Sequence, residues 1–239
     1  SAVLTLTVLF RTKSCVKLHL SRLRIDTGML KKIINIGIPS AIQMALTAFA
    51  NVFVQSYIAG TEGSMTVNTG GWTTYSKVDQ FIFLPIQSLA LATTTFVGQN
   101  LGAGEYERVK KGARFGVLSA VVLAELIGAV VFLFAPALIA AFDSTPEVVR
   151  FGVEKSRTAG LFFFLLAYSH SMAAILRGAG KAVIPMVVML VFWCIVRVTF
   201  LTISVPLTQS IQMVYWVYPL TWLLSSVTFF LYSRKADWL

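Results

Sequence analysis

Long apolar segments alternate with short polar ones along almost the whole chain. Six of the apolar segments are long enough for a helix to cross about 30 Å of hydrocarbon at about 1.5 Å per residue. They lie at residues 33–59, 74–98, 115–142, 158–177, 182–205 and 210–233. A shorter apolar stretch, SAVLTLTVLF (residues 1–10), is interpreted as the remnant of a preceding transmembrane helix. The pattern predicts an all-α polytopic membrane protein with six transmembrane helices and this remnant.

The composition supports a membrane protein. Hydrophobic residues make up 56% of the chain and charged residues 13%, and the mean hydropathy is +0.77. Ordinary globular domains contain about 45–50% apolar and about 25% charged residues. A soluble fold of this size would lack the polar side chains needed to cover its surface. The two cysteines, Cys15 in a basic loop and Cys194 in an apolar span, predict neither a disulfide nor a metal site.

The net charge of +10 reflects topology rather than binding of nucleic acid. Fifteen of the twenty Lys and Arg residues lie in segment 11–32, segment 99–114, the turn near 178 and the last six residues. The alternate connections hold only Arg150, Lys155 and Arg157. The positive-inside rule therefore places the basic connections and both chain ends in the cytoplasm of a multi-pass plasma-membrane protein. The expected parts are the remnant 1–10, a basic cytoplasmic loop 11–32, a six-helix lobe 33–233 and a cytoplasmic tail 234–239.

Two glycine-rich stretches interrupt the apolar pattern, FVGQNLGAGEYERVKKGAR (96–114) and RGAGKA (177–182). Neither matches the spacing of a dinucleotide or phosphate loop, and no β-strand precedes either of them. Both are interpreted as helix exits on the cytoplasmic side, because glycine readily adopts left-handed dihedrals. EYERVKKGAR is typical of a short amphipathic helix at the membrane surface. The predicted exit motif comprises Gly98, Gln99, Asn100, Gly102, Gly104, Arg177, Gly178 and Gly180.

These segments resemble one family closely. TTFVGQNLGAGEYERVKKGAR is similar to the loop after the eighth helix of multidrug and toxic-compound extrusion (MATE) transporters. IGIPSAIQMALTAFANVFVQSYIA, KVDQFIFLPIQSLALATTTFVGQN and LRGAGKAVIPM resemble helix seven, helix eight and the turn between helices ten and eleven. The resemblance covers nearly the whole chain and implies the C-terminal lobe of a two-lobe transporter. Its partners would be the missing N-terminal lobe, small organic cations and the lipid bilayer, with transport by rocking of the lobes.

Charged and amide side chains within the spans are the candidate cavity residues. A charge at the bilayer centre costs about 2.5–3.5 kcal/mol on insertion scales, so each one needs a partner or a function. Asp79 either pairs with cationic substrates or the coupling ion, or forms a structural salt bridge. Intramembrane amides either join helices or line a cavity, and His170 either relays protons or packs through hydrogen bonds. The candidates are Asp79, Gln80, Asn51, Gln55, Gln87 and His170.

Two further intramembrane charges are interpreted as structural. Glu125, in VVLAELIGAVV, is expected to be hydrogen-bonded between helices rather than to be a protonation site. Arg197, in FWCIVRVTFL, resembles an arginine common at this place in MATE transporters and is expected to bond to helix ends or acids. Some family members carry coupling acids on helices seven and ten. The matching spans here contain no Asp or Glu, so the choice between proton and sodium coupling stays open.

The resemblance implies a secondary active antiporter, not an enzyme. It would export organic, often cationic compounds in exchange for H⁺ or Na⁺ and would need no other cofactor and no bound metal. One alternative is a lipid-linked oligosaccharide flippase of the same superfamily, whose cavity should hold several arginines for pyrophosphate. Another is a half-transporter remnant without transport activity. A membrane-embedded enzyme would need clustered His, Asp, Glu or Cys, which the spans lack.

Overall fold

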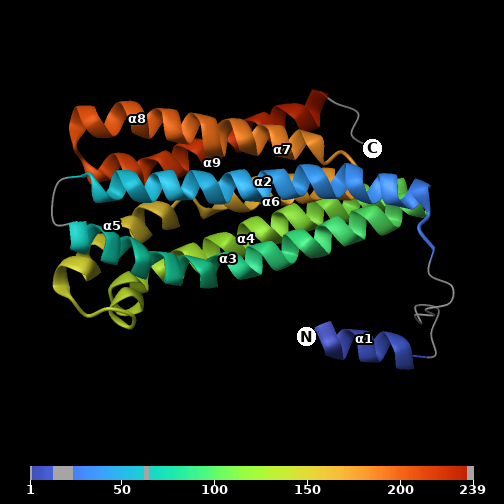
Figure 1. The fold of residues 1–239 in the computed structure, drawn as a ribbon, viewed down its shortest axis with the longest axis horizontal. Helices are drawn as coiled ribbons and strands as arrows, with labels where there is room; N and C mark the ends of the chain where they lie inside the picture. The colour runs from blue at the N-terminus through green and yellow to red at the C-terminus, as the bar shows by residue number, and fades with distance from the viewer. Residues whose placement is uncertain (1, 13–23, 62–64, 236–239) are drawn as a thin grey trace. The chain divides into compact units, whose positions relative to one another are not determined.

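The computed structural model describes residues 2–12, 24–61 and 65–235 (Figure 1). Within these residues the chain is helical and contains no strand, which confirms the predicted all-α class. The elements are α1 (Ala2–Arg11), α2 (Thr27–Ala59), α3 (Met65–Gly102), α4 (Tyr106–Ala140), α5 (Pro146–Gly160), α6 (Phe163–Gly178), α7 (Val183–Met189), the π-helix η2 (Leu190–Val196), α8 (Arg197–Thr208) and α9 (Ile211–Lys235). Ser1, residues 13–23 of the predicted basic loop with Cys15 and His19, and residues 236–239 of the predicted tail lie outside the described residues.

The chain divides into two units, Ser1–Asn35 and Ile36–Leu239. The first holds α1 and the start of α2. Helix α2 begins at Thr27, six residues before the predicted span, so the end of the predicted loop 11–32 is helical. The Met29 amide donates to Asp26 Oδ1 at 2.8 Å, so Asp26 caps the start of α2. A pattern of apolar residues alone does not reveal this cap.

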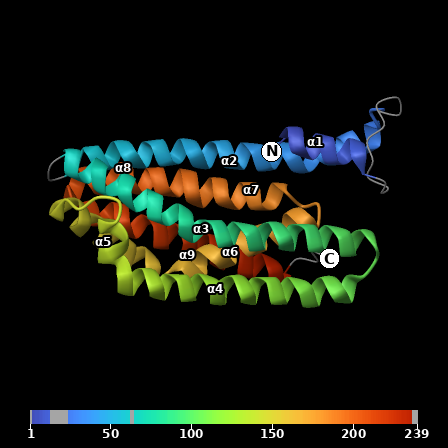
Figure 2. The ribbon, with the colours of Figure 1, turned by 90° about the horizontal axis from the view of Figure 1, so that it is seen from below.

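Among the described residues, five helices are long and apolar enough to cross a membrane, counting α7, η2 and α8 as one segment over Val183–Thr208. Helices α5 and α6 meet at a 58° bend and form a sixth crossing when taken together. The α3–α4 and α6–α7 connections lie at one end of this bundle, which we call the basic end (Figures 1 and 2). The end of α2, the start of α3 and the α4–α5 and α8–α9 connections lie at the opposite end.

Helix α5 corrects the predicted start of the fourth span at residue 158. It begins at Pro146 after Thr145, and the Thr145 amide donates to Asp143 Oδ1 at 2.9 Å, which lowers the pKa of that carboxyl. The charged residues on the outer face of α5 lower the hydropathy averaged along this segment. The segment therefore resembles a loop in the sequence, although it is helical. Its other face is buried and consists of Val148, Phe151, Gly152, Lys155, Ser156, Ala159 and Gly160.

The expected surface helix EYERVKKGAR is not a separate element. Helix α4 runs without interruption from Tyr106 to Ala140, so these residues form its first turns. No glycine in a left-handed conformation and no proline separates them from the apolar part of the helix. Lys110 Nζ lies 3.2 Å from Glu107 Oε1 on the exposed side of the first turns.

The two glycine-rich turns bring α3 and α6 into close contact at the basic end. Gly104 and Gly180 have φ of 76° and 77°, the left-handed dihedrals expected where glycine ends a helix. Gly98 lies in α3 beside Gly178 of α6, whose carbonyl oxygen would be 3.5 Å from a Cβ at Gly98. The Thr94 hydroxyl donates across the same contact to Ala174 O at 3.1 Å. Gln99, Asn100 and Gly102 complete the last turn of α3, where Asn100 Nδ2 donates to Phe96 O at 2.7 Å.

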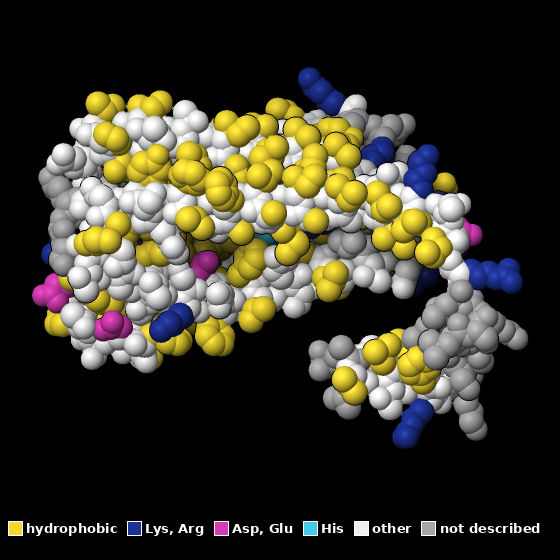
Figure 3. Space-filling model, in the orientation of Figure 1, with side chains coloured by type: hydrophobic (Ala, Val, Ile, Leu, Met, Phe, Trp, Pro, Cys, Tyr) yellow, Lys and Arg dark blue, Asp and Glu magenta, His cyan; other side chains and the backbone are white. Residues whose placement is uncertain are grey.

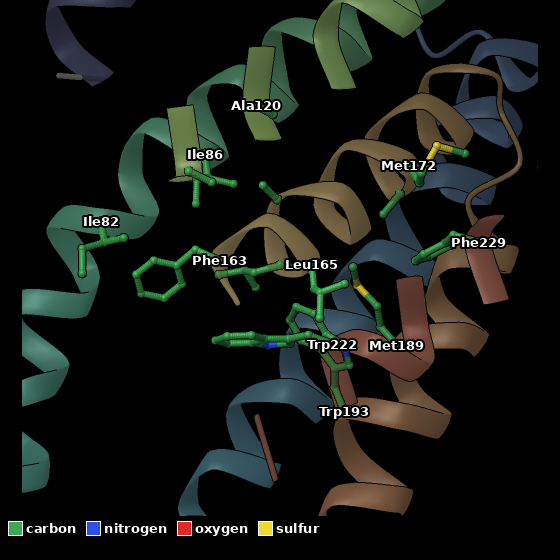
Figure 4. Packing of buried hydrophobic residues seen from close by; sticks show 14 of the residues in the cluster. Ile82, Ile86, Ala120, Phe163, Leu165, Met172, Met189, Trp193, Trp222 and Phe229 are labelled. Atoms are coloured by element: carbon green, nitrogen blue, oxygen red, sulfur yellow. The ribbon is translucent and has the colours of Figure 1, made fainter. Parts of the chain in front are cut away.

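The core of the bundle lies between α3, α4, α6 and α9. Figure 4 shows Phe163 and Leu165 of α6 between Ile82 and Ile86 on one side and Trp222 on the other. Outside this core, many large hydrophobic side chains are exposed, and Figure 3 shows hydrophobic groups distributed along the bundle, as expected of helices that face lipid.

Candidate functional site

A cavity of about 330 Å³ opens between α2 and the rest of the Ile36–Leu239 unit. Figure 3 shows a hollow in this face of the molecule with an acidic side chain in it. The wall combines aromatic rings, hydroxyls and amides with one carboxylate and one guanidinium. The lining residues are Thr47, Asn51, Gln55, Trp72, Tyr75, Ser76, Asp79, Gln80, Phe83, Leu166, Trp193, Arg197, Tyr218 and Trp222.

Asp79 is the carboxylate in this wall. Tyr75 lies one turn earlier on α3, and its hydroxyl donates to Asp79 Oδ1 at 2.9 Å. No Lys or Arg among the described residues forms an ion pair with Asp79. Lys77, two residues earlier on α3, is exposed, and its ammonium lies 5.9 Å from the centroid of the Phe142 ring. The carboxylate is therefore available to a ligand.

Three of the predicted amides lie with Asp79 in the wall of the cavity. Asn51 and Gln55 are one turn apart on α2, and Gln80 follows Asp79 on α3. All three side chains are exposed, and none forms a hydrogen bond to another described residue. These amides can donate and accept hydrogen bonds and have no fixed partners. Such groups suit ligands that differ in the positions of their polar groups better than one defined ligand.

Gln87 and His170 lie outside the wall. Gln87 is exposed on α3, two turns beyond Gln80. His170 is buried in α6 behind the cavity, with its ring centroid 4.8 Å from that of Phe83 and 5.2 Å from that of Trp193. Its Nε2 has no hydrogen-bond partner among the described residues. The imidazole thus supports two aromatic side chains of the wall from behind.

Arg197 lines the cavity from the start of α8 and is only 2% exposed. Its Nη2 donates to Thr221 Oγ1 at 3.0 Å, and its Cζ lies 4.2 Å from the centroid of the Tyr218 ring. The expected acid or helix-end partner is thus replaced, within the described residues, by a hydroxyl and an aromatic face. Aromatic faces attract guanidinium groups electrostatically.

Lys155 is the residue that the sequence analysis missed. It was assigned to a connection between spans, but its side chain is buried in the α5 face and 1% exposed. Its ammonium lies over the Tyr218 ring, 4.0 Å from the centroid. One signal was present in the sequence. Lys155 follows Phe151 by four residues and Val148 by seven, which places it on the same face of the helix as these two apolar residues.

Glu125 joins two helices away from the cavity. Its Oε1 accepts a hydrogen bond at 3.0 Å from the Phe164 amide, in the first turn of α6. The first amides of a helix have no partner within the helix, and an acidic side chain near them is favourable. The carboxylate therefore holds the start of α6, next to the bend from α5, against α4.

Replacing Glu125 with alanine is expected to destabilise the protein by about 1–3 kcal/mol, because a helix-terminal amide loses its acceptor in the bilayer. Glu125→Gln keeps an acceptor oxygen and should lose less. The measurement is thermal unfolding of the purified protein in detergent, followed by the reactivity of its cysteines. Equal melting temperatures for Glu125→Ala and the parent protein would contradict this role.

Arg177, predicted as part of the helix-exit motif, connects three elements near the basic end. Its Nη1 donates to Gln43 Oε1 of α2 at 3.4 Å. Gln43 Nε2 in turn donates to Met189 Sδ at the end of α7 at 2.6 Å. These bonds tie α2 to α6 and α7 on one side of the cavity.

Comparison with known proteins identifies the architecture. The MatE family model matches residues 39–203, which include α3 to η2 and most of α2 and α8. The chain belongs to the MatE family. The resemblance seen in the sequence is thereby confirmed, and Asp79, Lys155 and Arg197 all lie within the matched MatE region.

Two curated relatives come from bacteria. The "Probable multidrug resistance protein NorM" of Thermotoga maritima is 31% identical over 163 residues, covering 66% of this chain and 33% of the relative. The "Probable multidrug resistance protein YpnP" of Bacillus subtilis is 27% identical over 207 residues, covering 86% and 45%. This MatE chain thus spans a third to under half of their lengths.

A MOP superfamily transporter from Pyrococcus furiosus has the same fold, with a TM-score of 0.88 at 20% sequence identity. The match covers 98% of this MatE chain and 53% of the archaeal one. The six-helix arrangement is therefore one half of the fold of such transporters. The family consists of transporters rather than enzymes, as the sequence analysis predicted.

Proposed function

We propose that this chain forms one lobe of a secondary antiporter, which binds organic cations in the Asp79 cavity and exports them in exchange for H⁺ or Na⁺. The single observation that carries the proposal is the Asp79 carboxylate in an aromatic wall. It accepts one hydrogen bond, from Tyr75, and forms no ion pair within the described residues. The names of the two curated relatives support export of drugs.

The chemistry of the wall suits amphipathic cations. A carboxylate attracts the charge, and an aromatic face adds about 0.5–2 kcal/mol for a cation that it helps to desolvate. Trp72, Tyr75 and Tyr218 offer such faces within the lining. A volume of about 330 Å³ falls at the small end of ligand pockets, which a second lobe would enlarge.

The flippase alternative fits this cavity less well. A site for a lipid pyrophosphate should present several arginines, and Arg197 is the one arginine among the lining residues. Its Nη2 already donates to Thr221, and its Cζ lies over the Tyr218 ring. The half-transporter alternative is tested directly by transport, because a remnant would show no substrate flux.

The proposed topology has the basic end of the bundle in the cytoplasm of a plasma-membrane protein. Arg108, Lys110, Lys111 and Arg114 begin α4 at this end, and Arg177 ends α6 there. The second lobe is proposed to come from the same protein and to complete the cavity opposite Asp79.

The proposal is tested with tetraphenylphosphonium, a lipophilic cation, and with the protein at the full length that its gene encodes. We expect saturable binding in equilibrium dialysis, competed by other lipophilic cations and not by lipophilic anions. In proteoliposomes an imposed proton or sodium gradient should drive its accumulation, and comparing the two gradients assigns the ion. Absence of saturable binding, or competition by anions alone, would overturn the proposal.

A further inference from the structure

Lys155 carries a buried charge. The binding of a cation at Asp79 does not by itself explain why this charge is there. Its side chain is 1% exposed, and its ammonium donates one hydrogen bond, to Tyr215 O at 3.3 Å. No carboxylate among the described residues forms an ion pair with it. A charge in such a place is costly, which calls for a function.

An aromatic cage surrounds this ammonium. Nζ lies 4.0 Å from the ring centroid of Tyr218, 5.6 Å from those of Trp72 and Tyr75, and 5.7 Å from that of Tyr215. Three of the four rings, Trp72, Tyr75 and Tyr218, also line the cavity. A cation bound in the cavity would therefore contact aromatic rings that already contact the Lys155 ammonium. These rings would lie between the bound cation and Lys155.

The same wall connects Lys155 to Asp79. Tyr75 turns its ring toward the ammonium and donates its hydroxyl to the carboxylate, at 2.9 Å. Tyr75 therefore contacts both charged groups, Lys155 through its ring and Asp79 through its hydroxyl. Asp79 is thus the negative charge that balances Lys155 when the cavity is empty.

The other groups around Lys155 offer no such balance. Arg197, on α8, is a second cation and shares the Tyr218 ring, at 4.2 Å. Tyr215 and Tyr218, on α9, contribute phenol rings, and Tyr75 does so from α3. On α5 itself, Glu154 is paired with Arg150 at 3.2 Å on the exposed face.

We propose that Lys155 is an internal counter-cation that couples cation binding to proton release. In the empty cavity the protonated ammonium balances Asp79. When an organic cation binds beside Asp79, Lys155 Nζ gives its proton to water and becomes a neutral amine, so the net charge of the site is unchanged. Lysine suits this role because, unlike arginine, it loses its proton readily in a buried site. The inference rests on the proposed function, since it needs a cation at Asp79.

The inference also supplies a coupling group for this lobe. The spans that match helices seven and ten contain no acid, and the exchange of one cation for one proton needs only a group that titrates beside the substrate site. Occupancy of the site by a cation and protonation of Lys155 would exclude each other, which is the requirement for antiport.

The test measures proton release when tetraphenylphosphonium binds to the full-length protein in weakly buffered detergent solution. The parent protein should release about one proton per bound cation, and its affinity should rise with pH. Lys155→Met should release almost none and bind about tenfold more tightly, because the competing charge is gone. Lys155→Arg should bind at least about tenfold more weakly, with little dependence on pH. Lys77→Met, which removes an exposed lysine from α3, should behave as the parent does.

The outcomes separate this inference from the proposed function. Proton release that persists in Lys155→Met would assign the proton to Asp79 or another group and overturn the inference, while cation binding would stand. Parent-like affinity and pH dependence in Lys155→Arg would also overturn it, and this variant serves if Lys155→Met does not fold. No saturable binding by the parent protein would overturn both.

Discussion

Asp79→Asn is expected to lower cation affinity and cation efflux about 100-fold or more. The substitution removes the negative charge from the wall of the cavity and keeps the size of the side chain. At about 4 Å and an effective dielectric of about 20, such a charge pair contributes about 4 kcal/mol, and each 1.4 kcal/mol is a tenfold change. The amide oxygen of the substituted side chain can still accept from the Tyr75 hydroxyl, so the fold should be retained.

This effect is measured as tetraphenylphosphonium binding and as resistance of cells that express the protein to toxic lipophilic cations. Glu125→Gln is the matched control, since it removes one intramembrane acid outside the cavity and should leave efflux near the parent level. Protein in the membrane is quantified for every variant. Parent-like efflux by Asp79→Asn at equal protein level would refute the assignment of Asp79 as the cation site.

Gly178→Ala is expected to prevent or strongly impair folding of the bundle. A Cβ at Gly178 would lie 2.6 Å from Thr94 O and 2.9 Å from Val97 Cβ, both in α3. The helices would have to separate at this point, and the bond from Thr94 Oγ1 to Ala174 O would lengthen or break. Inserting one extra carbon into a packed contact typically costs about 1–3 kcal/mol of stability. We expect a cost at the upper end here, because the new Cβ would meet a backbone oxygen, which cannot rotate away as a side chain can.

Gly102→Ala provides the control for this prediction. Gly102 ends α3 at the other glycine-rich turn, as Gly178 ends α6, but a Cβ there would meet nothing within 4 Å, and its φ is not positive. Size-exclusion profiles and melting temperatures of the two variants in detergent make the comparison. Equal stability of Gly178→Ala and Gly102→Ala would show that α3 and α6 do not rely on this close contact.

The sequence predicts most of the architecture because membrane helices follow hydropathy. The six apolar segments fall on the five long apolar helices and the bent α5–α6 pair of the described residues, and the glycine turns lie where the apolar pattern breaks. Of the six residues predicted to line a cavity, Asp79, Gln80, Asn51 and Gln55 line one, and Gln87 and His170 lie outside it. Those residues are polar in apolar surroundings, which is a signal that a single sequence contains.

The missed features depend on amphipathic or long-range contacts. The first turns of α5 resemble a loop because four of their residues are charged, so the burial of Lys155 among them was not predicted. The aromatic cage combines Trp72 and Tyr75 of α3 with Tyr215 and Tyr218 of α9, about 140 residues later. Aromatic residues are common in membrane spans, and nothing in their spacing shows which of them will meet.

The π-helix η2 sets the orientation of α8, and so of Arg197, toward the cavity. A π-helix closes its hydrogen bonds over five residues instead of four, so Leu190–Val196 accommodates one residue more than a regular α-helix. If the same residues wound as a regular α-helix, the extra residue would no longer be absorbed and α8 would turn by about 100° relative to α7. Arg197 would then leave Thr221 and Tyr218, although no lining residue had been substituted. In this part of the lobe the winding of the backbone specifies the site as strictly as the side chains do.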